Sequence, residues 1–251
     1  MGNISDSNSG LGSRPSLANN VALVTGGSRG IGKAIALKVA QLGAAVSICS
    51  RNSQSLESAA REMQQSGTKV FAQAADVTKA GDVANLVEAT EKELGPITIL
   101  VNNAGIGNPG FGPVHERSEA DWDLVLNTNL KSVFLLSKSV APLMIRRGRG
   151  DIVNISSLAG KNTFAGGGLY CASKWALQGL AGCMAEDLRA YGIRVSLICP
   201  GSVATEFSGR GPKNPSKALS AGDVAHAVAM LLLQGPQSFI SEVQLRPVAK
   251  P

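Results

Sequence analysis

Short, nearly continuous apolar runs alternate with longer stretches of helical periodicity along most of the chain. The apolar runs are rich in β-branched residues, and we expect strands at residues 21–25, 45–50, 69–74, 97–101, 151–156, 194–199 and 239–245. Apolar positions on both sides of a strand indicate a sheet covered on both faces. The helical stretches lie near residues 30–42, 53–66, 79–94, 118–147, 169–191 and 222–234. Strands that alternate with helices predict a parallel sheet wound by right-handed crossovers.

The pattern runs through the chain without an internal repeat or a second domain. Residues 1–18 are rich in Ser, Asn and Gly, and we expect a flexible N-terminal tail there. Residues 19–251 are expected to form a single α/β domain. Within it, residues 204–221 between the sixth strand and the last helix are expected to form a short lid.

The chain carries a net charge of +6, but its 24 lysines and arginines are scattered along the sequence. Only 4% of the residues are aromatic, so the sequence offers no platform on which nucleic-acid bases could stack. We therefore expect no nucleic-acid partner, and the positive charge is better suited to anionic small molecules. No apolar run approaches the ~18–20 residues of a membrane span, so we expect no membrane partner.

The four cysteines (Cys49, Cys171, Cys183 and Cys199) form no CxxC motif and have no metal-ligand spacing. Cysteines of this kind are typical of a reduced compartment, and we expect the protein to be cytoplasmic. The two histidines are isolated from each other in the sequence, so we expect no metal site.

A glycine-rich turn connects the first predicted strand to the first predicted helix, in the sequence Gly26-Gly27-Ser28-Arg29-Gly30-Ile31-Gly32. Backbone N–H groups at a helix N-terminus face outward and form a site for an anion. Gly26 permits the turn, Gly30 lets the backbone approach a pyrophosphate, and Gly32 allows close packing of helix and strand. The turn therefore predicts a dinucleotide site after the first strand.

Tyr170 and Lys174 are four residues apart in a predicted helix, so they share one face and lie about 5–6 Å apart at Cβ. An ammonium group that close stabilises a phenolate, and we expect it to lower the pKa of the tyrosine from its reference near 10. A phenol of lowered pKa gives and takes protons near neutral pH, as the interconversion of a carbonyl and an alcohol requires.

These motifs occur together with Asn102-Asn103-Ala104-Gly105, Ser157 and Pro200-Gly201. In their order and spacing over residues 20–245, the chain resembles the short-chain dehydrogenase/reductase superfamily and is similar to its 3-oxoacyl-carrier-protein reductases and NADP-dependent carbonyl reductases. The resemblance implies a single-domain Rossmann fold of three αβα layers, with a seven-stranded parallel sheet in the order 3-2-1-4-5-6-7. It also implies an oxidoreductase that transfers a hydride between a nicotinamide cofactor and a carbonyl or secondary alcohol.

The resemblance also implies roles for four side chains. Tyr170 is the general acid in reduction, and Lys174 lowers its pKa and holds the nicotinamide ribose. Ser157 hydrogen-bonds the carbonyl oxygen of the substrate, and Asn129 holds a water that passes protons to Lys174. The family spacing favours Ser157 over the serine one position earlier, and Asn129 over the asparagine two positions earlier.

The end of the second predicted strand bears on the choice of cofactor. It reads Ser50-Arg51-Asn52, without the acidic residue that holds the ribose 2′-OH in folds that prefer NAD. A guanidinium group suits a phosphate, so Arg51, assisted by Arg29 in the glycine turn, is expected to meet the 2′-phosphate of NADP(H).

The remaining predicted cofactor contacts follow the other strands. By the resemblance, pairs of residues after the third, fourth and sixth strands meet the adenine, the ribose and the nicotinamide amide, respectively: Asp76 and Val77, Asn103 and Gly105, Val203 and Thr205. The complete predicted cofactor site is Gly26, Ser28, Arg29, Gly30, Ile31, Gly32, Arg51, Asn52, Asp76, Val77, Asn103, Ala104, Gly105, Tyr170, Lys174, Pro200, Gly201, Val203 and Thr205.

The substrate is less well specified. Residues 240–247 lack the Asp-Gly-Gly ending common among 3-oxoacyl-carrier-protein reductases and look more like the ending of relatives that act on small hydroxy acids and ketones. Reduction of 3-oxoacyl thioesters and reduction of general ketones both stay open. The alternatives from other classes are a sugar-nucleotide epimerase and a non-catalytic NADP-sensing or scaffold protein of the same fold. The chain keeps all four catalytic residue types, which favours an enzyme.

The long helical stretches 118–147 and 169–191 carry more apolar residues than one covered stripe requires. In relatives the corresponding helices pair across a two-fold axis. We therefore expect a homotetramer or a homodimer.

Overall fold

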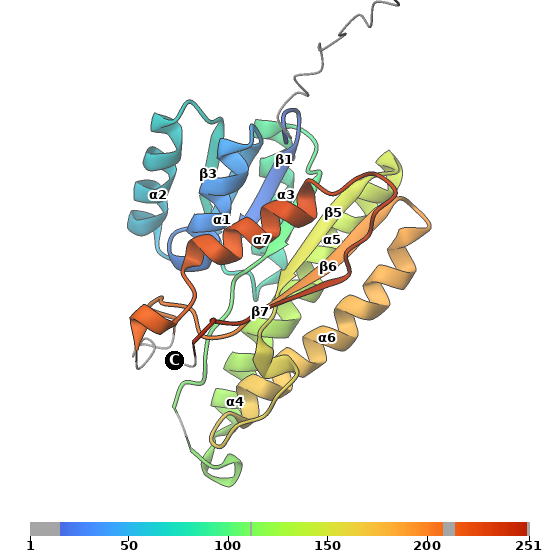
Figure 1. Cartoon of the computed structure of the whole chain (residues 1–251). Helices are drawn as coiled ribbons and strands as arrows, with labels where there is room; N and C mark the ends of the chain where they lie inside the picture. Colours follow the sequence, from blue (N-terminus) through green and yellow to red (C-terminus); the bar gives the residue numbers. More distant parts are fainter. Residues whose placement is uncertain (1–15, 111, 208–213, 250–251) are drawn as a thin grey trace, which may run out of the picture.

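The computed structural model describes residues 16–110, 112–207 and 214–249. Helices cover both faces of one parallel sheet in three layers, and the strands pair in the order β3-β2-β1-β4-β5-β6-β7 (Figure 1). The predicted fold, including the order of the strands, is therefore confirmed. The strands are β1 (Val21–Thr25), β2 (Ala45–Ser50), β3 (Val70–Ala74), β4 (Ile99–Asn102), β5 (Gly150–Ile155), β6 (Ile193–Pro200) and β7 (Glu242–Leu245).

The helices divide between the two faces of the sheet. Buried residues of α1, α2 and α7 form one core with the strands, and those of α3, α5 and α6 form the other. The helices are α1 (Gly30–Gln41), α2 (Ser53–Gln65), α3 (Ala80–Leu94), α4 (Glu119–Leu126), α5 (Ser132–Arg147), α6 (Gly168–Arg189) and α7 (Ala221–Leu232).

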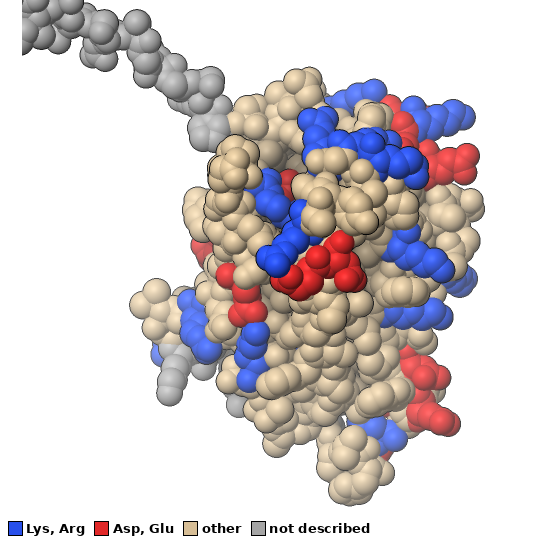
Figure 2. All heavy atoms as spheres, turned by 90° about the vertical axis from the view of Figure 1, so that its right-hand side faces the viewer, with Lys and Arg blue, Asp and Glu red and all other residues tan. Residues whose placement is uncertain are grey.

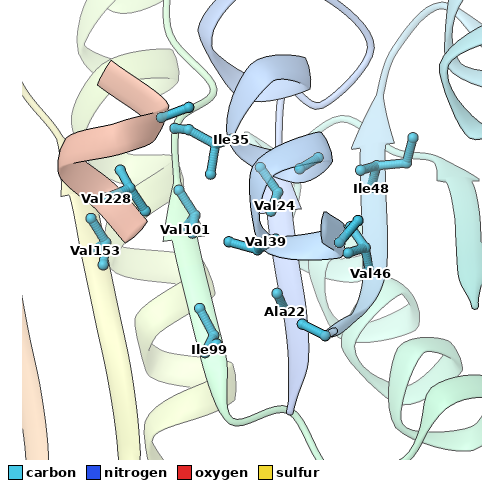
Figure 3. Packing of buried hydrophobic residues seen from close by; sticks show 14 of the residues in the cluster. Ala22, Val24, Ile35, Val39, Val46, Ile48, Ile99, Val101, Val153 and Val228 are labelled. Carbon is cyan, nitrogen blue, oxygen red and sulfur yellow. The ribbon is translucent and has the colours of Figure 1, made fainter. Parts of the chain in front are cut away.

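Successive residues of a central strand face opposite layers. Ala22 and Val24 of β1 lie in the core with Ile35 and Val39 of α1 (Figure 3), whereas Leu23 belongs to the core on the other face. Burying a side chain of the size of valine or leucine contributes about 1.5–3 kcal/mol. Both faces of the sheet therefore need apolar residues, which explains why the strands read as continuous apolar runs.

The segment 118–147, expected to be one helix, is divided into two. A π-helical turn at Asn127–Lys131 separates α4 from α5. Such a turn changes the helical repeat over only a few residues, so the apolar periodicity on either side does not reveal it. The turn contains Asn129, one of the predicted catalytic residues, and its position therefore bears on the site.

The ends of the domain differ in detail from the expected boundaries. Of the predicted tail, residues 1–15 lie outside the described residues, whereas Leu17 is buried and its N–H donates to the carbonyl of Leu42 at 2.7 Å. Strand β7 starts three residues later than expected, because the side chain of Gln234 accepts from the N–H of Ile240 and keeps that residue in a loop. Of the predicted lid, residues 208–213 lie outside the described residues.

Over the part of the chain that the structure describes, no helix combines the length and the apolar character needed to cross a membrane.

Candidate active site

The predicted site residues follow strands β1 to β6 or lie on α6 and the π-helical turn. The carboxyl ends of parallel strands lie together, so the loops after these strands meet at one edge of the sheet. In Figure 1 this edge is the lower one, opposite the end at which the chain enters β1.

The glycine turn after β1 has the backbone that the sequence predicts. Gly26 and Gly30 have φ angles of 66° and 56°, a region that favours glycine. A Cβ atom on Gly32 would collide with the carbonyl oxygen of Gly26 and the side chain of Asn103. Glycine is therefore required at this third position for the helix to start directly over the turn.

The start of α1 fits a dinucleotide phosphate. Its N-cap residue, Arg29, makes no side-chain hydrogen bond to the first turn, so the N–H groups there have no cap from the protein. A Cβ atom on Gly30 would meet only the side chain of Thr205 within 4 Å, at 3.7 Å from its Cγ2 atom. The uncapped helix end and the open space above Gly30 are both suited to a pyrophosphate.

The motif after β4 is fastened to the same turn. Thr25 Oγ1 accepts from the N–H groups of Asn103 and Ala104, both at 3.0 Å. The side-chain amide of Asn103 donates to the carbonyl of Thr25 at 2.9 Å. The structure therefore brings these two predicted cofactor contacts, and Gly105 after them, beside the glycine turn.

The loops after β2 and β3 lie at the same edge of the sheet as the glycine turn. Arg51 is exposed, and Asn52 caps α2 by accepting from the N–H of Ser55 at 2.9 Å. Burial alone would raise the pKa of Asp76, but hydrogen bonds from Thr78 and the charges of Lys79 and Arg51 hold it below its ordinary value. The guanidinium of Arg51 therefore lies close enough to the loop after β3 to act on its carboxylate.

Arg29, expected to assist Arg51, contacts the loop after β6 instead. Its Nη1 atom pairs with Glu206 Oε2 at 2.9 Å, and both side chains are largely exposed. Glu206 follows Val203 and Thr205 in the loop after β6, where Val203 bridges to Leu219. The ion pair thus connects the glycine turn to the start of the predicted lid.

The predicted catalytic residues converge around the end of β5. Ser157 lies two residues after the end of that strand, and its Oγ atom accepts from the N–H of Ala159 at 3.1 Å. Tyr170 lies in the first turn of α6, with its ring edge-on to Phe207 at 6.1 Å between centroids. Lys174 lies one turn later and is buried, and its Nζ atom donates to the carbonyl of Ile155 at 3.0 Å. The Nζ atom is 5.8 Å from the centre of the Tyr170 ring.

The pKa values of the pair differ from the expectation based on spacing. Burial raises the pKa of Tyr170, and the hydrogen bond of its hydroxyl with Ser157 only partly offsets this effect. Burial also lowers the pKa of Lys174 from 10.5 to about 8. The expected lowering of the tyrosine pKa by Lys174 is therefore wrong for the protein alone, because burial is the largest effect on the pKa of both groups.

Asn129 is buried, and the protein uses both ends of its side-chain amide. Its Oδ1 atom accepts from the N–H of Ile106 at 2.8 Å, and its Nδ2 atom donates to the carbonyl of Ile106 at 2.9 Å and to Ser173 Oγ at 3.1 Å. A Cβ atom on Gly105 would lie 3.2 Å from Asn129 Oδ1 and 3.9 Å from Lys174 Nζ. Asn129 therefore lies beside the catalytic lysine, and the water relay expected of it stays a prediction.

The neighbouring serine has a different environment from Ser157. Ser156 is buried, and its Oγ atom accepts from Gln178 Nε2 at 2.8 Å. The hydroxyl of Ser157 is therefore the one that faces Tyr170, whereas that of Ser156 holds α6 against β5.

One residue at the site escaped the sequence analysis. Asn108, in the loop after β4, accepts from the backbone N–H of Tyr170 at 3.0 Å and donates to the carbonyl of Gly166 at 2.7 Å. No spacing rule links an asparagine to a helix 62 residues later, so only the fold reveals this contact.

A family model described as short chain dehydrogenase matches residues 20–215 of the chain. The chain belongs to the short-chain dehydrogenase family. As a member of this family it is an NAD(P)-dependent oxidoreductase that acts on CH–OH groups.

Similar proteins cover most of the chain. Dehydrogenase/reductase SDR family member 4 of Oryctolagus cuniculus is 42% identical over 200 residues, which are 80% of this chain and 76% of the relative. Gluconate 5-dehydrogenase of Gluconobacter oxydans is 42% identical over 195 residues, which are 78% of this chain and 75% of the relative. The crystal structure of a metagenomic short-chain oxidoreductase in complex with NADP has a TM-score of 0.83 and 43% identity, and the match covers 93% of this chain and 99% of that one.

Proposed function

We propose that this short-chain dehydrogenase uses NADP(H) to interconvert a carbonyl compound and a secondary alcohol. The observation that supports this most strongly is the position of the Tyr170 hydroxyl. Ser157 acts on its pKa, Lys174 Nζ lies 5.8 Å from the centre of its ring, and it lies at the same edge of the sheet as the uncapped N-terminus of α1. A proton donor and a dinucleotide site at one edge are what reduction of a carbonyl requires.

Each side chain has a role that its surroundings support. The cofactor supplies or accepts the hydride when it is bound. Tyr170 gives a proton to the carbonyl oxygen in reduction and removes it in oxidation, and Ser157 donates a hydrogen bond that orients that oxygen. Lys174, held by Ile155, places a positive charge beside the phenol and would hold the nicotinamide ribose of a bound cofactor. Asn129 fixes the loop that follows β4 by holding both polar groups of Ile106.

The preference for NADP(H) rests on the loop after β2. Arg51 is exposed there, no acidic residue ends the strand, and the guanidinium acts on the neighbouring loop through Asp76. A 2′-phosphate offers the guanidinium a stronger partner than a ribose hydroxyl does. The similar oxidoreductase that was solved with NADP supports the same choice.

The substrate class is proposed more broadly, as a small ketone, a hydroxy acid or a 3-oxoacyl thioester. The ring of Phe207 lies edge-on to Tyr170 and is about half exposed, so it supplies apolar surface for the carbon chain of a substrate. The similarity to gluconate 5-dehydrogenase favours hydroxy acids and their ketones.

The test is a set of turnover assays with purified protein. NADPH and NADH are each offered with acetoacetyl thioesters, diketones and oxo acids, which are the oxidised forms of hydroxy acids. The loss of reduced cofactor is followed by its absorbance. We expect turnover with at least one class and a lower KM for NADPH than for NADH. Tight NADPH binding without turnover on any substrate would instead support the alternative, a non-catalytic NADP-sensing or scaffold protein.

We also propose that the protein forms a homotetramer or a homodimer through α5 and α6. Phe134 on α5 and Trp175 on α6 are 48% and 50% exposed. Phe134 lines an apolar groove of about 420 Å³ that includes Leu130 and Leu180. The surface on the α6 side of the molecule has a broad area without charged side chains (Figure 2). Light scattering coupled to size exclusion tests this assembly, and a fully active monomer would contradict it.

A cytoplasmic location is the last part of the proposal. All four cysteines are free thiols, and three of them are buried. Thiols that stay reduced are typical of a reducing compartment.

A further inference from the structure

The helix that carries the catalytic pair has no cap from its own sequence. Its N-cap residue is Gly167, which has no side chain to bond the N–H groups of the first turn. The N-cap residues of α2, α4 and α7 are Asn52, Ser118 and Ser220. Their side chains accept hydrogen bonds from the first turns of their own helices. The free N–H groups of α6 therefore need a partner from elsewhere in the fold.

Asn108 provides that partner from the loop after β4. Its Oδ1 atom accepts from the N–H of Tyr170 at 3.0 Å, and its Nδ2 atom donates to the carbonyl of Gly166 at 2.7 Å. The two bonds fix the orientation of the amide, because a reversed amide would place a donor against an N–H group and an acceptor against a carbonyl. The Asn108 side chain thus connects Gly166, which precedes the N-cap of α6, to Tyr170 in the first turn of that helix.

The loop that carries Asn108 is itself held at two points. The N–H of Asn103 donates to Thr25 Oγ1 at the glycine turn, and both backbone polar groups of Ile106 bond to Asn129. A path of direct hydrogen bonds and five residues of backbone therefore leads from the cofactor turn to Asn108 and on to Tyr170. These contacts therefore connect the backbone of Tyr170 to the glycine turn.

We propose that Asn108 is a positioning residue that sets the place of Tyr170 relative to the cofactor. The inference rests on the proposed function, because it assigns Asn108 an effect on the proton donor of that reaction. The rest of α6 is held by other contacts, including the buried Leu177 and Ala181 and the bond of Gln178 to Ser156. Loss of the amide therefore loosens the first turn of α6 and leaves the fold in place.

The experiment compares Asn108→Ala with Asn162→Ala as the matched control. The Asn162 amide makes one bond, to the carbonyl of Leu158 within its own turn, and it is exposed. We expect Asn108→Ala to lower kcat by roughly 10- to 100-fold, the range that a misplacement of about 1 Å produces. The Kd for NADPH is expected to stay within about 2-fold, and the control to match the unmodified protein in both measurements.

A second variant separates the two bonds of the amide. Asn108→Asp keeps an acceptor for the N–H of Tyr170, and a carboxylate is favourable at a helix N-terminus. It loses the donor to Gly166. We expect its kcat to lie between those of the unmodified protein and Asn108→Ala. Combined with Tyr170→Phe, Asn108→Ala is expected to cause no further loss, because the group that it positions is already absent.

Hydrogen exchange at residues 168–172 tests the positioning without any turnover. We expect Asn108→Ala to speed exchange of these amides by roughly 3- to 10-fold, in line with the loss of one hydrogen bond, and Asn162→Ala to leave it unchanged. If Asn108→Ala speeds exchange but the unmodified protein turns over no substrate, the proposed function is refuted, whereas the role of Asn108 as the cap of α6 is supported. Unchanged exchange together with an unchanged kcat would overturn the inference. An equal loss of NADPH affinity and kcat would also overturn it, because Asn108 would then act on the whole site.

Discussion

The glycine turn after β1 and the catalytic corner around Ser157 and Tyr170 lie at the same edge of the sheet but are held by different contacts. The turn is fixed by local backbone, since Gly26 and Gly30 take left-handed φ angles and Gly32 packs against the carbonyl of Gly26. The corner is fixed by side chains from segments far apart in the sequence, such as Asn129 in the π-helical turn and Asn108 in the loop after β4. A short sequence motif therefore determines the geometry of the turn, whereas the corner forms only when the whole chain has folded.

The two regions also differ in how they treat charge. In the glycine turn and after β2, Arg29 and Arg51 are exposed to solvent. In the corner, Lys174 is 4% exposed and its pKa falls to about 8. The exposed arginines beside the glycine turn are therefore suited to an anion from solvent. Around Ser157, by contrast, burial shifts the pKa values of the titratable groups.

The largest effect is expected from Lys174→Met, which removes the buried charge at similar volume. Turnover is expected to fall by roughly 10²- to 10⁴-fold, the range of general acid–base catalysis. Lys138→Met on the exposed face of α5 serves as the control. Near-normal turnover of Lys174→Met would mean that the corner does not depend on this charge.

The unmodified protein and Lys174→Met are also expected to differ in how their stability depends on pH. The unfolded lysine titrates near 10.5 and the folded one near 8, so the unfolded state binds more protons between these values. The contribution of Lys174 to the stability of the cofactor-free protein is therefore expected to rise as the pH increases from 8 to 10.5, with a cost of the order of 3 kcal/mol remaining below pH 8. Burial raises the pKa of Cys49 from 9.0 to about 12, which acts in the opposite sense above pH 9. Denaturant titration therefore measures the rise as the difference in stability between the unmodified protein and Lys174→Met.

A smaller effect is expected from Gly32→Ala at the cofactor turn. The added methyl group collides with the Gly26 carbonyl and with Asn103, and overpacking of this kind costs about 1–3 kcal/mol. NADPH affinity is expected to fall by roughly 10- to 100-fold when measured by fluorescence titration. Gly81→Ala is the matched control, since a Cβ atom there meets nothing within 4 Å. Equal NADPH affinity in the two variants would show that the turn tolerates a side chain.

The smallest of these effects is a change of cofactor preference in Arg51→Asp. A carboxylate repels a 2′-phosphate and accepts from a 2′-hydroxyl, so the ratio of kcat/KM for NADPH over NADH is expected to fall by roughly 10-fold or more. Arg61→Asp on α2 applies the same charge change to another exposed arginine of that region and is expected to leave the ratio unchanged. A ratio near one in the unmodified protein would remove the basis for this preference.

The sequence was informative where the chemistry is local. The parallel sheet, the glycine turn and the position of Tyr170 and Lys174 on one helix could be predicted from motifs and periodicity, the family resemblance implied the order of the strands, and the fold is confirmed. The π-helical turn around Asn129 could not, because a shift in helical repeat over a few residues leaves the apolar pattern intact. The pKa directions were also beyond reach, since they depend on how deeply the folded chain buries Tyr170 and Lys174.

The most direct test of the central claim compares Tyr170→Phe with Tyr191→Phe. These are the two tyrosines of the chain, and Tyr191 is 49% exposed after α6. We expect Tyr170→Phe to bind NADPH with unchanged Kd and to lose turnover by roughly 10²- to 10⁴-fold, because only the proton donor is removed, while Tyr191→Phe keeps full activity. Turnover by Tyr170→Phe at the rate of the unmodified protein would contradict the assignment of Tyr170 as the group that exchanges the proton.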